Sequence, residues 1–158
     1  MNSLRAALSE RVVIADGAMG TMLQARNPSL EDFQNHEGCN EILNVTRPDI
    51  VLEVHNAYFE TGIDCVETNT FGANWSNLSD YGIEDQIEEL ARLGAEIARG
   101  SADSFTAKDG KPRWVLGSMG PGTKLPTLGH TTYDNLKQTF ALQAKGLIAG
   151  GADAFMVE

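Results

Sequence analysis

Residues 62–69 read GIDCVETN and residues 151–158 read GADAFMVE. Each stretch begins at a glycine that can end a helix, passes an aspartate and continues as a short apolar run toward a polar residue, Asn69 or Glu158. Short apolar runs that alternate with helical segments predict an α/β fold with a parallel sheet. Because such a sheet carries its chemistry at the carboxyl ends of its strands, we expect Asn69 and Glu158 to lie at a site.

The spacing of the apolar runs predicts four strands in one domain over residues 1–158. Between the strands, the sequence predicts a helix that Gly62 ends, a helix over 83–104 and a helix that Thr132 caps. Four βα units are about half of a TIM (β/α)8 barrel, and a small open doubly wound sheet is an equal alternative on pattern alone. The predicted strands cover residues 12–14, 64–68, 114–118 and 154–157.

Composition narrows the class of protein. The chain has 22 acidic and 12 basic residues, and its net charge of −10 argues against a nucleic-acid partner. No apolar run approaches the roughly 20 residues that span a bilayer, and no secretory leader is evident, so we expect a cytoplasmic protein without a membrane partner. The two cysteines, Cys39 and Cys65, lack metal-ligand spacing and are expected to be reduced thiols.

A loop of small residues follows the first predicted strand. It reads Asp16-Gly17-Ala18-Met19-Gly20-Thr21 and lets backbone N–H groups approach a ligand closely. Carboxylates such as Asp16 and Glu158 bind an ammonium group, and backbone amides bind a carboxylate. Together these groups predict an amino-acid site, although Asp16 could equally anchor only its own turn.

Other polar residues have weaker assignments. Glu67 and Asn69 could be a general acid or base with its orienting amide, or a buried polar pair of the sheet. His55 is interpreted as a helix residue whose ring is satisfied by hydrogen bonds rather than as a ligand. His36, Cys39 and His130 fit no zinc spacing, so no metal site is predicted in this chain.

Five ordered motifs carry a family resemblance over nearly the whole chain. They are Asp16 to Met22 (DGAMGTM), His55 to Gly62 (HNAYFETG), Glu67 to Phe71 (ETNTF), Gly120-Pro121, and the run from Gly150 to Glu158. In this order and at these intervals they resemble the N-terminal homocysteine-binding (homocysteine S-methyltransferase) domain of the cobalamin-dependent methionine synthase family. The order of five motifs makes the resemblance more specific than any single one.

The resemblance implies a (β/α)8 barrel that binds L-homocysteine at the carboxyl ends of its strands. It further implies a zinc ion held by three cysteines, which turns the homocysteine thiol into a thiolate. The thiolate takes a methyl group from methylcobalamin and becomes methionine, so the implied pathway is methionine biosynthesis. The cobalamin is then remethylated by 5-methyltetrahydrofolate. Folate- and cobalamin-binding modules of the same polypeptide are the implied partners.

Carried over by position, the resemblance assigns the substrate contacts. Asp16 and Glu158 would hold the substrate ammonium, backbone N–H groups around Gly17, Ala18 and Met19 would receive its carboxylate, and Glu67 and Asn69 would lie beside the site. Ala18 stands where the family usually has glycine, which requires a negative φ at that residue.

The implied zinc cysteines belong to later strands, and Cys39 and Cys65 do not match them. We therefore expect a barrel truncated after its fourth strand, with no cofactor bound by this segment and no activity for the 158 residues alone.

Two alternative functions stay open on the sequence. A homocysteine methyltransferase that uses betaine or S-methylmethionine would keep the same site with another methyl donor. A non-catalytic half-barrel that binds an amino acid would also be compatible with the glycine loops and carboxylates.

Overall fold

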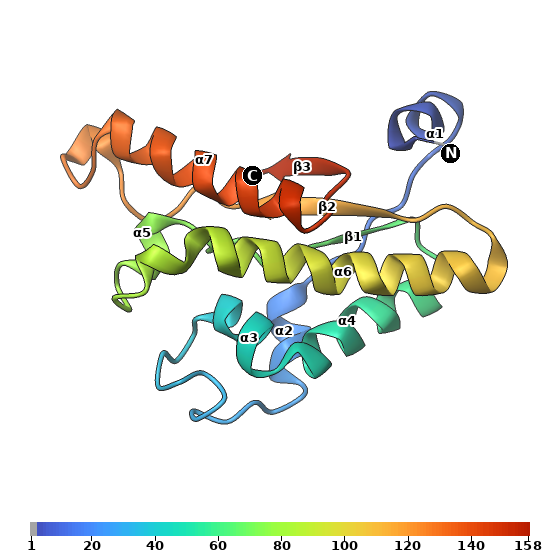
Figure 1. Ribbon diagram of the computed structural model, residues 1–158, viewed down its shortest axis with the longest axis horizontal. Helices are drawn as coiled ribbons and strands as arrows, with labels where there is room; N and C mark the ends of the chain where they lie inside the picture. The colour runs from blue at the N-terminus through green and yellow to red at the C-terminus, as the bar shows by residue number, and fades with distance from the viewer. Residues whose placement is uncertain (1–2) are drawn as a thin grey trace.

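The computed structural model describes residues 3–158, which form a three-stranded parallel sheet flanked by helices (Figure 1). The strands are β1 (Cys65–Glu67), β2 (Trp114–Met119) and β3 (Ala154–Val157), in the spatial order β1-β2-β3. The α-helices are α1 (Leu4–Glu10), α2 (Met19–Gln24), α3 (Leu43–Thr46), α4 (Pro48–Glu60), α5 (Trp75–Leu78), α6 (Ile87–Asp109) and α7 (Tyr133–Ala149). The 3-10 helices are η1 (Asn40–Ile42), η2 (Glu84–Gln86) and η3 (Pro126–Leu128).

The prediction of a first strand over 12–14 is wrong. The segment runs beside β1, but it makes a single β-bridge, between Ala15 and Cys65. The Asp64 side chain takes the N–H of Ile14 at 2.9 Å, and the Ile14 carbonyl accepts from the N–H groups of both Asp64 and Cys65, at 2.9 and 3.1 Å. The Asp64 carboxylate therefore accepts the N–H that a strand partner would otherwise bind, and residues 12–14 form no regular strand beside β1.

The helix predicted over 83–104 has different bounds in the structure. The 3-10 turn η2 precedes it, and α6 runs from Ile87 to Asp109. It ends where Gly110 adopts the left-handed conformation, with φ of 74°. The predicted cap at Thr132 is confirmed, because its side chain accepts a hydrogen bond from the N–H of Asn135.

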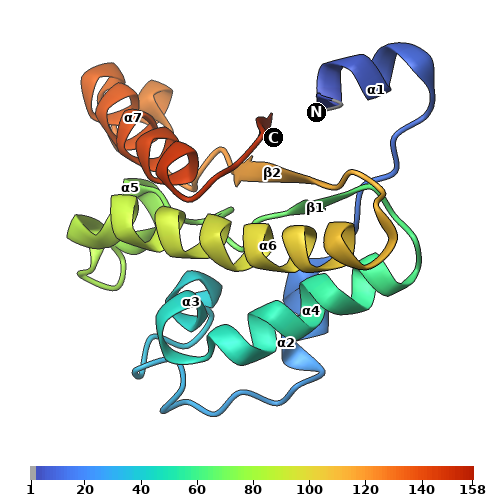
Figure 2. The ribbon, with the colours of Figure 1, turned by 45° about the vertical axis from the view of Figure 1, so that its right-hand side comes forward.

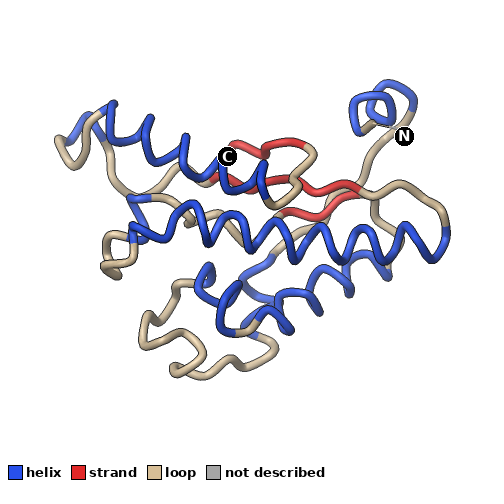
Figure 3. Tube along the Cα trace, in the orientation of Figure 1, coloured by secondary structure: helices blue, strands red, loops and turns tan. Residues whose placement is uncertain are grey.

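The two faces of the sheet are covered by different helices. On one face, Val66 and Val115 pack with residues of α4 and α6. On the opposite face, Cys65, Trp114 and Leu116 pack with α1. Figure 2 shows α6 running along the sheet with α4 beneath it and α1 set apart at the other side. Figure 3 shows how short the strands are beside the helices, so the positions just beyond the strand ends belong to loops.

Helices α6 and α7 cross at close range because α7 carries glycine at the contact. A Cβ added at Gly146 would lie 2.2 Å from the Glu88 carbonyl, and one at Gly150 would lie 2.3 Å from that of Arg92. The close packing fixes α7, and hence β3 after it, against the rest of the fold. Within residues 3–158, no helix is both long and apolar enough to cross a membrane.

Candidate functional site

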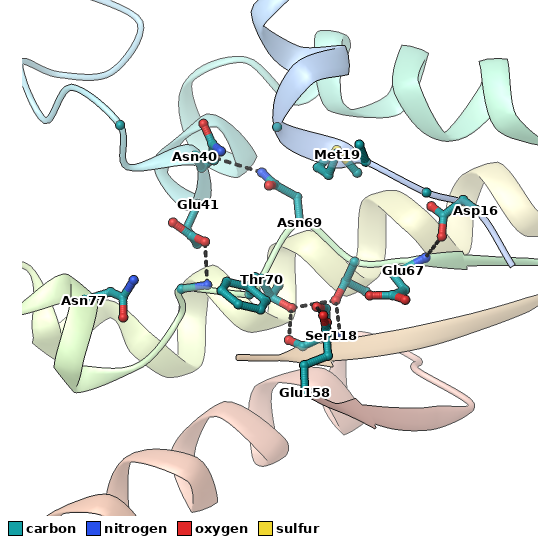
Figure 4. Close-up of a pocket in the computed structure, with 17 residues that line it drawn as sticks. Asp16, Met19, Asn40, Glu41, Glu67, Asn69, Thr70, Asn77, Ser118 and Glu158 are labelled. Atoms are coloured by element: carbon teal, nitrogen blue, oxygen red, sulfur yellow. Dashed lines mark hydrogen bonds between the residues drawn. The ribbon is translucent and has the colours of Figure 1, made fainter. Parts of the chain in front are cut away.

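A cavity of about 540 Å³ opens where β1, β2 and β3 end (Figure 4). It collects residues from the loop after the bridge at Ala15, from the turn at η1 and from all three strand ends. All seven predicted site residues line it, namely Asp16, Gly17, Ala18, Met19, Glu67, Asn69 and Glu158. Its remaining lining residues are Gly20, Gly38, Asn40, Glu41, Thr68, Thr70, Phe71, Gly72, Asn77 and Ser118.

Strand alternation explains why three polar side chains meet here. Glu67 lies two residues after Cys65, Ser118 two after Leu116 and Glu158 two after Met156, and these three apolar residues share one face of the sheet. Because side chains alternate along a strand, Glu67, Ser118 and Glu158 continue that face. The register, which pairs Ser118 with Met156, then brings Ser118 next to Glu158.

Asp16 stands on the loop beside the end of β1. Its Oδ1 accepts a hydrogen bond from the backbone N–H of Glu67, at 2.9 Å, and its own N–H donates to the Cys65 carbonyl, at 3.1 Å. Burial raises the pKa of Asp16 to about 7, and the nearby Glu67 carboxyl adds to the rise. A half-buried carboxyl without a neighbouring cation is suited to receive one from a ligand.

Glu67 and Glu158 approach the cavity from the ends of β1 and β3. Burial raises the pKa of Glu67, and the Glu158 carboxylate beside it raises that pKa further. The Ser118 hydroxyl donates to Glu158 Oε1 at 3.0 Å. Within residues 3–158, neither acid nor Asp16 forms an ion pair with a lysine or arginine.

The small-residue loop leads directly into α2. Ala18 is the N-cap residue, with φ of −55°, so its methyl group is accommodated as the sequence required. The first N–H groups of a helix have no partner within the helix. The segment from Gly17 to Met19 therefore presents backbone donors to the cavity that Asp16 and Glu158 also line.

Asn69 is held by its neighbours. Its side-chain amide donates to the Asn40 carbonyl at 2.8 Å and to Asn44 Oδ1 at 3.0 Å, as Figure 4 shows for the first contact. Asn44 in turn donates to the backbone carbonyls of Asn69 and Leu90. Asn69 thus ties the η1 turn to the end of β1 while it lines the cavity.

Glu41 was missed by sequence reasoning. Its carboxyl is buried at the cavity wall, where Oε1 accepts from the Gly72 N–H at 2.7 Å and the Cys39 thiol donates to Oε2 at 3.8 Å. Burial raises its pKa. An acid within a polar connection gives no sequence signal of burial, so only the folded chain reveals this position.

The cysteines of this chain do not fit a zinc site. Cys39 and Cys65 are buried, and burial raises the pKa of each thiol to about 12, which opposes the thiolate form that zinc binds. Cys65 packs against Trp114 outside the cavity lining. Among residues 3–158, no three His, Cys, Asp or Glu side chains group so as to hold a metal ion.

The interpretation of His55 as a hydrogen-bonded ring is wrong. The ring is fully buried in α4, and neither ring nitrogen has a hydrogen-bond partner among the described residues. Burial lowers its pKa to about 4, so it is neutral at pH 7. His55 does not line the cavity, but Tyr58 of the same motif donates to the carbonyl of Ala18, which does, at 3.0 Å.

The fold and the cavity together define the class of protein. It is a parallel α/β protein with a small acidic cavity at the carboxyl ends of its strands, where carboxylates can bind an ammonium group and a helix start can bind a carboxylate. The family follows from sequence comparison. A family model described as homocysteine S-methyltransferase matches residues 13–158, and the chain belongs to that family.

Two curated relatives are similar over most of the chain. Methionine synthase from Mycobacterium tuberculosis (strain ATCC 25618 / H37Rv) is 58% identical over 151 residues, and that from Mycobacterium leprae (strain TN) is 57% identical over 151 residues. Both matches cover 96% of this chain, whereas the chain spans only 13% and 12% of the length of the two relatives.

Solved structures agree on the fold. The homocysteine methyltransferase MmuM from Escherichia coli is 25% identical, with a TM-score of 0.76 for its metallated form and 0.75 for its oxidized form. The matches cover 98% and 96% of this chain, and 56% and 55% of the MmuM chains.

Proposed function

We propose that this chain is the homocysteine-binding part of a methionine synthase and that the cavity at the strand ends binds L-homocysteine. The observation that carries the proposal is the meeting of Asp16, Glu67 and Glu158 in one cavity without a lysine or arginine partner among residues 3–158. The identity of 58% to a methionine synthase supports the same reading.

The ligand's ammonium group supplies what the acids lack. An ammonium carries three N–H donors, and three carboxylates from different parts of the chain face the cavity. Binding of the ammonium offsets the cost of burying Asp16 as an anion, a cost that its raised pKa expresses. The acids therefore select an amino acid over a simple thiol.

The ligand's carboxylate is placed by the loop that starts α2. Backbone N–H groups around Gly17, Ala18 and Met19 are oriented by the helix and need no side-chain movement to bind an anion. With ammonium and carboxylate held on this side, the thiol-bearing side chain extends into the rest of the cavity. Asn69 lines that route.

In the complete protein we propose that the methyl group comes from methylcobalamin, recharged by 5-methyltetrahydrofolate, and that the product is methionine. The higher identity to methionine synthases than to MmuM favours this donor over betaine or S-methylmethionine. A zinc ion would supply thiol ionisation, and its ligands would come from outside residues 1–158, because the cysteines here do not fit.

We also propose that the extended segment at 12–15 and the three strands are the first four positions of a (β/α)8 barrel. The match to 55–56% of the MmuM chains supports a half-barrel. Its open edges expose apolar side chains, such as Val12 at 82% and Val157 at 76% exposure. We expect residues 1–158 alone to be inactive and to self-associate, and light scattering that shows a stable monomer would contradict the half-barrel.

Calorimetric titration of homocysteine into the natural full-length protein tests the proposed ligand. We expect Glu158→Gln to weaken binding about tenfold, because the substitution removes the charge of an acid that lines the cavity and would contact the ammonium. Asp134→Asn is the matched control, since Asp134 is exposed in the first turn of α7, away from the cavity, and should leave the affinity unchanged. Equal affinity for wild type and Glu158→Gln would refute the site.

The same titration with and without zinc separates catalysis from sensing. Affinity that depends on zinc indicates thiol activation and supports the methyltransferase. Affinity that is independent of zinc favours the alternative of an amino-acid-binding module.

A further inference from the structure

Ser118 lies between the two acids at the ends of β1 and β3. Its hydroxyl donates to Glu158 Oε1 at 3.0 Å, and the Ser118 side chain also lowers the pKa of the neighbouring Glu67 carboxyl. Figure 4 shows Glu67, Ser118 and Glu158 on the same side of the cavity. We propose that Ser118 is the positioning residue of the ammonium subsite, because it holds the Glu158 carboxylate near that of Glu67, where the two can receive one ammonium group.

The Ser118 backbone is held in place by buried hydrogen bonds. Its N–H donates to Thr68 Oγ1 at 3.0 Å, and its carbonyl accepts from Thr70 Oγ1 at 2.8 Å. The two threonine hydroxyls lie 2.6 Å apart, so the turn after β1 and the end of β2 form one closed network. These side chains are at most 3% exposed. Such a network fixes the backbone that carries the Ser118 hydroxyl more strongly than separate contacts do.

A residue of α7 completes this network from outside the cavity. Gln143 is fully buried, and its amide donates to the Thr70 carbonyl at 2.7 Å and to the Ser118 carbonyl at 3.3 Å. Gln143 does not line the cavity. The position of Ser118 is therefore tied to the packing of α7 on the sheet.

The chemistry of a hydroxyl explains why this position suits a cationic ligand. A serine has one O–H to donate, and in the structure it donates to Glu158, with the Glu67 carboxyl nearby. One hydroxyl is enough to keep the acids in place, but it leaves most of their oxygens without a donor. The three N–H groups of an ammonium fill that deficit, so Ser118 preorganises the pair without replacing the ligand.

The inference rests on the proposed homocysteine site, and one pair of ligands tests it in the natural full-length protein. Homocysteine carries the ammonium, whereas its deamino analogue, mercaptobutanoate, keeps the thiol and the carboxylate. We expect Ser118→Ala to weaken homocysteine binding about tenfold, since a hydrogen bond to a charged group is lost, and to change the affinity for the analogue by less than about twofold. A merely structural role would weaken both ligands alike.

Two further variants sharpen the test. Ser101→Ala is the matched control, because Ser101 is equally buried and bonds Asn56 at 2.7 Å, away from the cavity. It should leave both affinities unchanged. Gln143→Met removes the support from α7 and should weaken homocysteine binding about threefold while sparing the analogue. The Gln143→Met variant also tests the inference if Ser118→Ala folds poorly.

The outcomes distinguish failure of the inference about Ser118 from failure of the proposed homocysteine site. If the wild type binds homocysteine no better than mercaptobutanoate, the proposed site is wrong. If the wild type prefers homocysteine and neither Ser118→Ala nor Gln143→Met alters that preference, the site stands and the role of Ser118 is overturned. Loss of both ligands in equal measure also overturns it.

Discussion

Both ends of the sheet carry acidic residues, but only those at the amino end are paired with arginines. At the amino end, Asp64 and Asp153 stand one residue before β1 and β3. Asp64 accepts the N–H of Ile14 at 2.9 Å, and Asp153 accepts the N–H of Val115 at 2.8 Å. An arginine completes each contact, with Arg11 at 2.7 Å from Asp64 and Arg99 at 2.9 Å from Asp153.

At the carboxyl end, Asp16, Glu67 and Glu158 have no arginine or lysine partner within residues 3–158. The pKa values record the difference. The hydrogen bond from Arg11 lowers the pKa of Asp64, whereas burial raises the pKa of Asp16 to about 7. The acids of the amino end are paired with arginines of the protein itself, whereas those of the carboxyl end are free to bind the cation that we propose a ligand supplies.

The largest expected effect is a difference in homocysteine affinity between variants at the two ends of the sheet. Asp16→Asn should weaken homocysteine binding by more than about 100-fold, or about 3 kcal/mol, because a charge facing the ammonium is lost. Asp64→Asn removes a charge from the other end of the sheet and should change the affinity by less than about threefold. Calorimetric titration measures the affinity of both variants. Similar losses of affinity in the two would show that the acids at the carboxyl end have no special role in binding.

The same pair of variants should shift stability in opposite directions. Asp64→Asn should lower the free energy of unfolding by about 2 kcal/mol, since charged hydrogen bonds to Arg11 and the Ile14 N–H are weakened. Asp16→Asn keeps an acceptor for the Glu67 N–H and removes a buried charge, so it should raise the stability at pH 8. Urea denaturation followed by circular dichroism gives both values.

The pH dependence of that second effect has a definite sign. The folded-state pKa of Asp16 lies above its ordinary value of 3.8, so its contribution to stability is full below pH 4 and is lost as pH rises toward 7. The advantage of Asp16→Asn over wild type should therefore grow between pH 4 and pH 7 and then level off. A constant difference across this range would show that Asp16 titrates normally.

The acids that line the cavity could be predicted in large part from the sequence. Glu158 is expected there because it ends an apolar run, Asp16 because it precedes a loop of small residues, and Glu67 stays open between a site residue and a buried polar pair. The sequence does not reveal that Ser118 lies beside Glu158, which depends on the register that pairs Ser118 with Met156. Strand register depends on tertiary packing, so no local sequence pattern predicts it.

The errors in the fold have a similar origin. The run at 12–14 has strand composition, but Asp64, fifty residues away, captures the N–H of Ile14 and interrupts the ladder. The burial of Glu41 and the unpaired ring of His55 also depend on elements that are distant in sequence. Periodicity locates a helix or a strand, whereas a side chain's partners are set by packing.

Proton release on ligand binding is a smaller effect that sharpens the contrast. The ligand 2-aminobutanoate keeps the ammonium and the carboxylate of homocysteine and has no thiol to ionise. Its ammonium should lower the pKa of Asp16 from about 7, so binding at pH 6 should release close to one proton, and affinity should fall by up to about tenfold per pH unit below 7. Calorimetry in buffers of different ionisation enthalpy counts the proton, and Asp16→Asn should reduce the count.

The smallest expected effect concerns the ion pair at the amino end. Arg11 is 46% exposed at its side chain, so water and salt screen its attraction to Asp64. Arg11→Gln should therefore lower the free energy of unfolding only slightly, and less still in 1 M NaCl. Asp64→Asn should remain the costlier change in high salt, because the short-range hydrogen bond from the Ile14 N–H is weakened less by salt than the ion pair is. If the two variants cost the same at every salt concentration, the ion pair itself, and not the capture of a backbone N–H, is what Asp64 contributes to this end of the sheet.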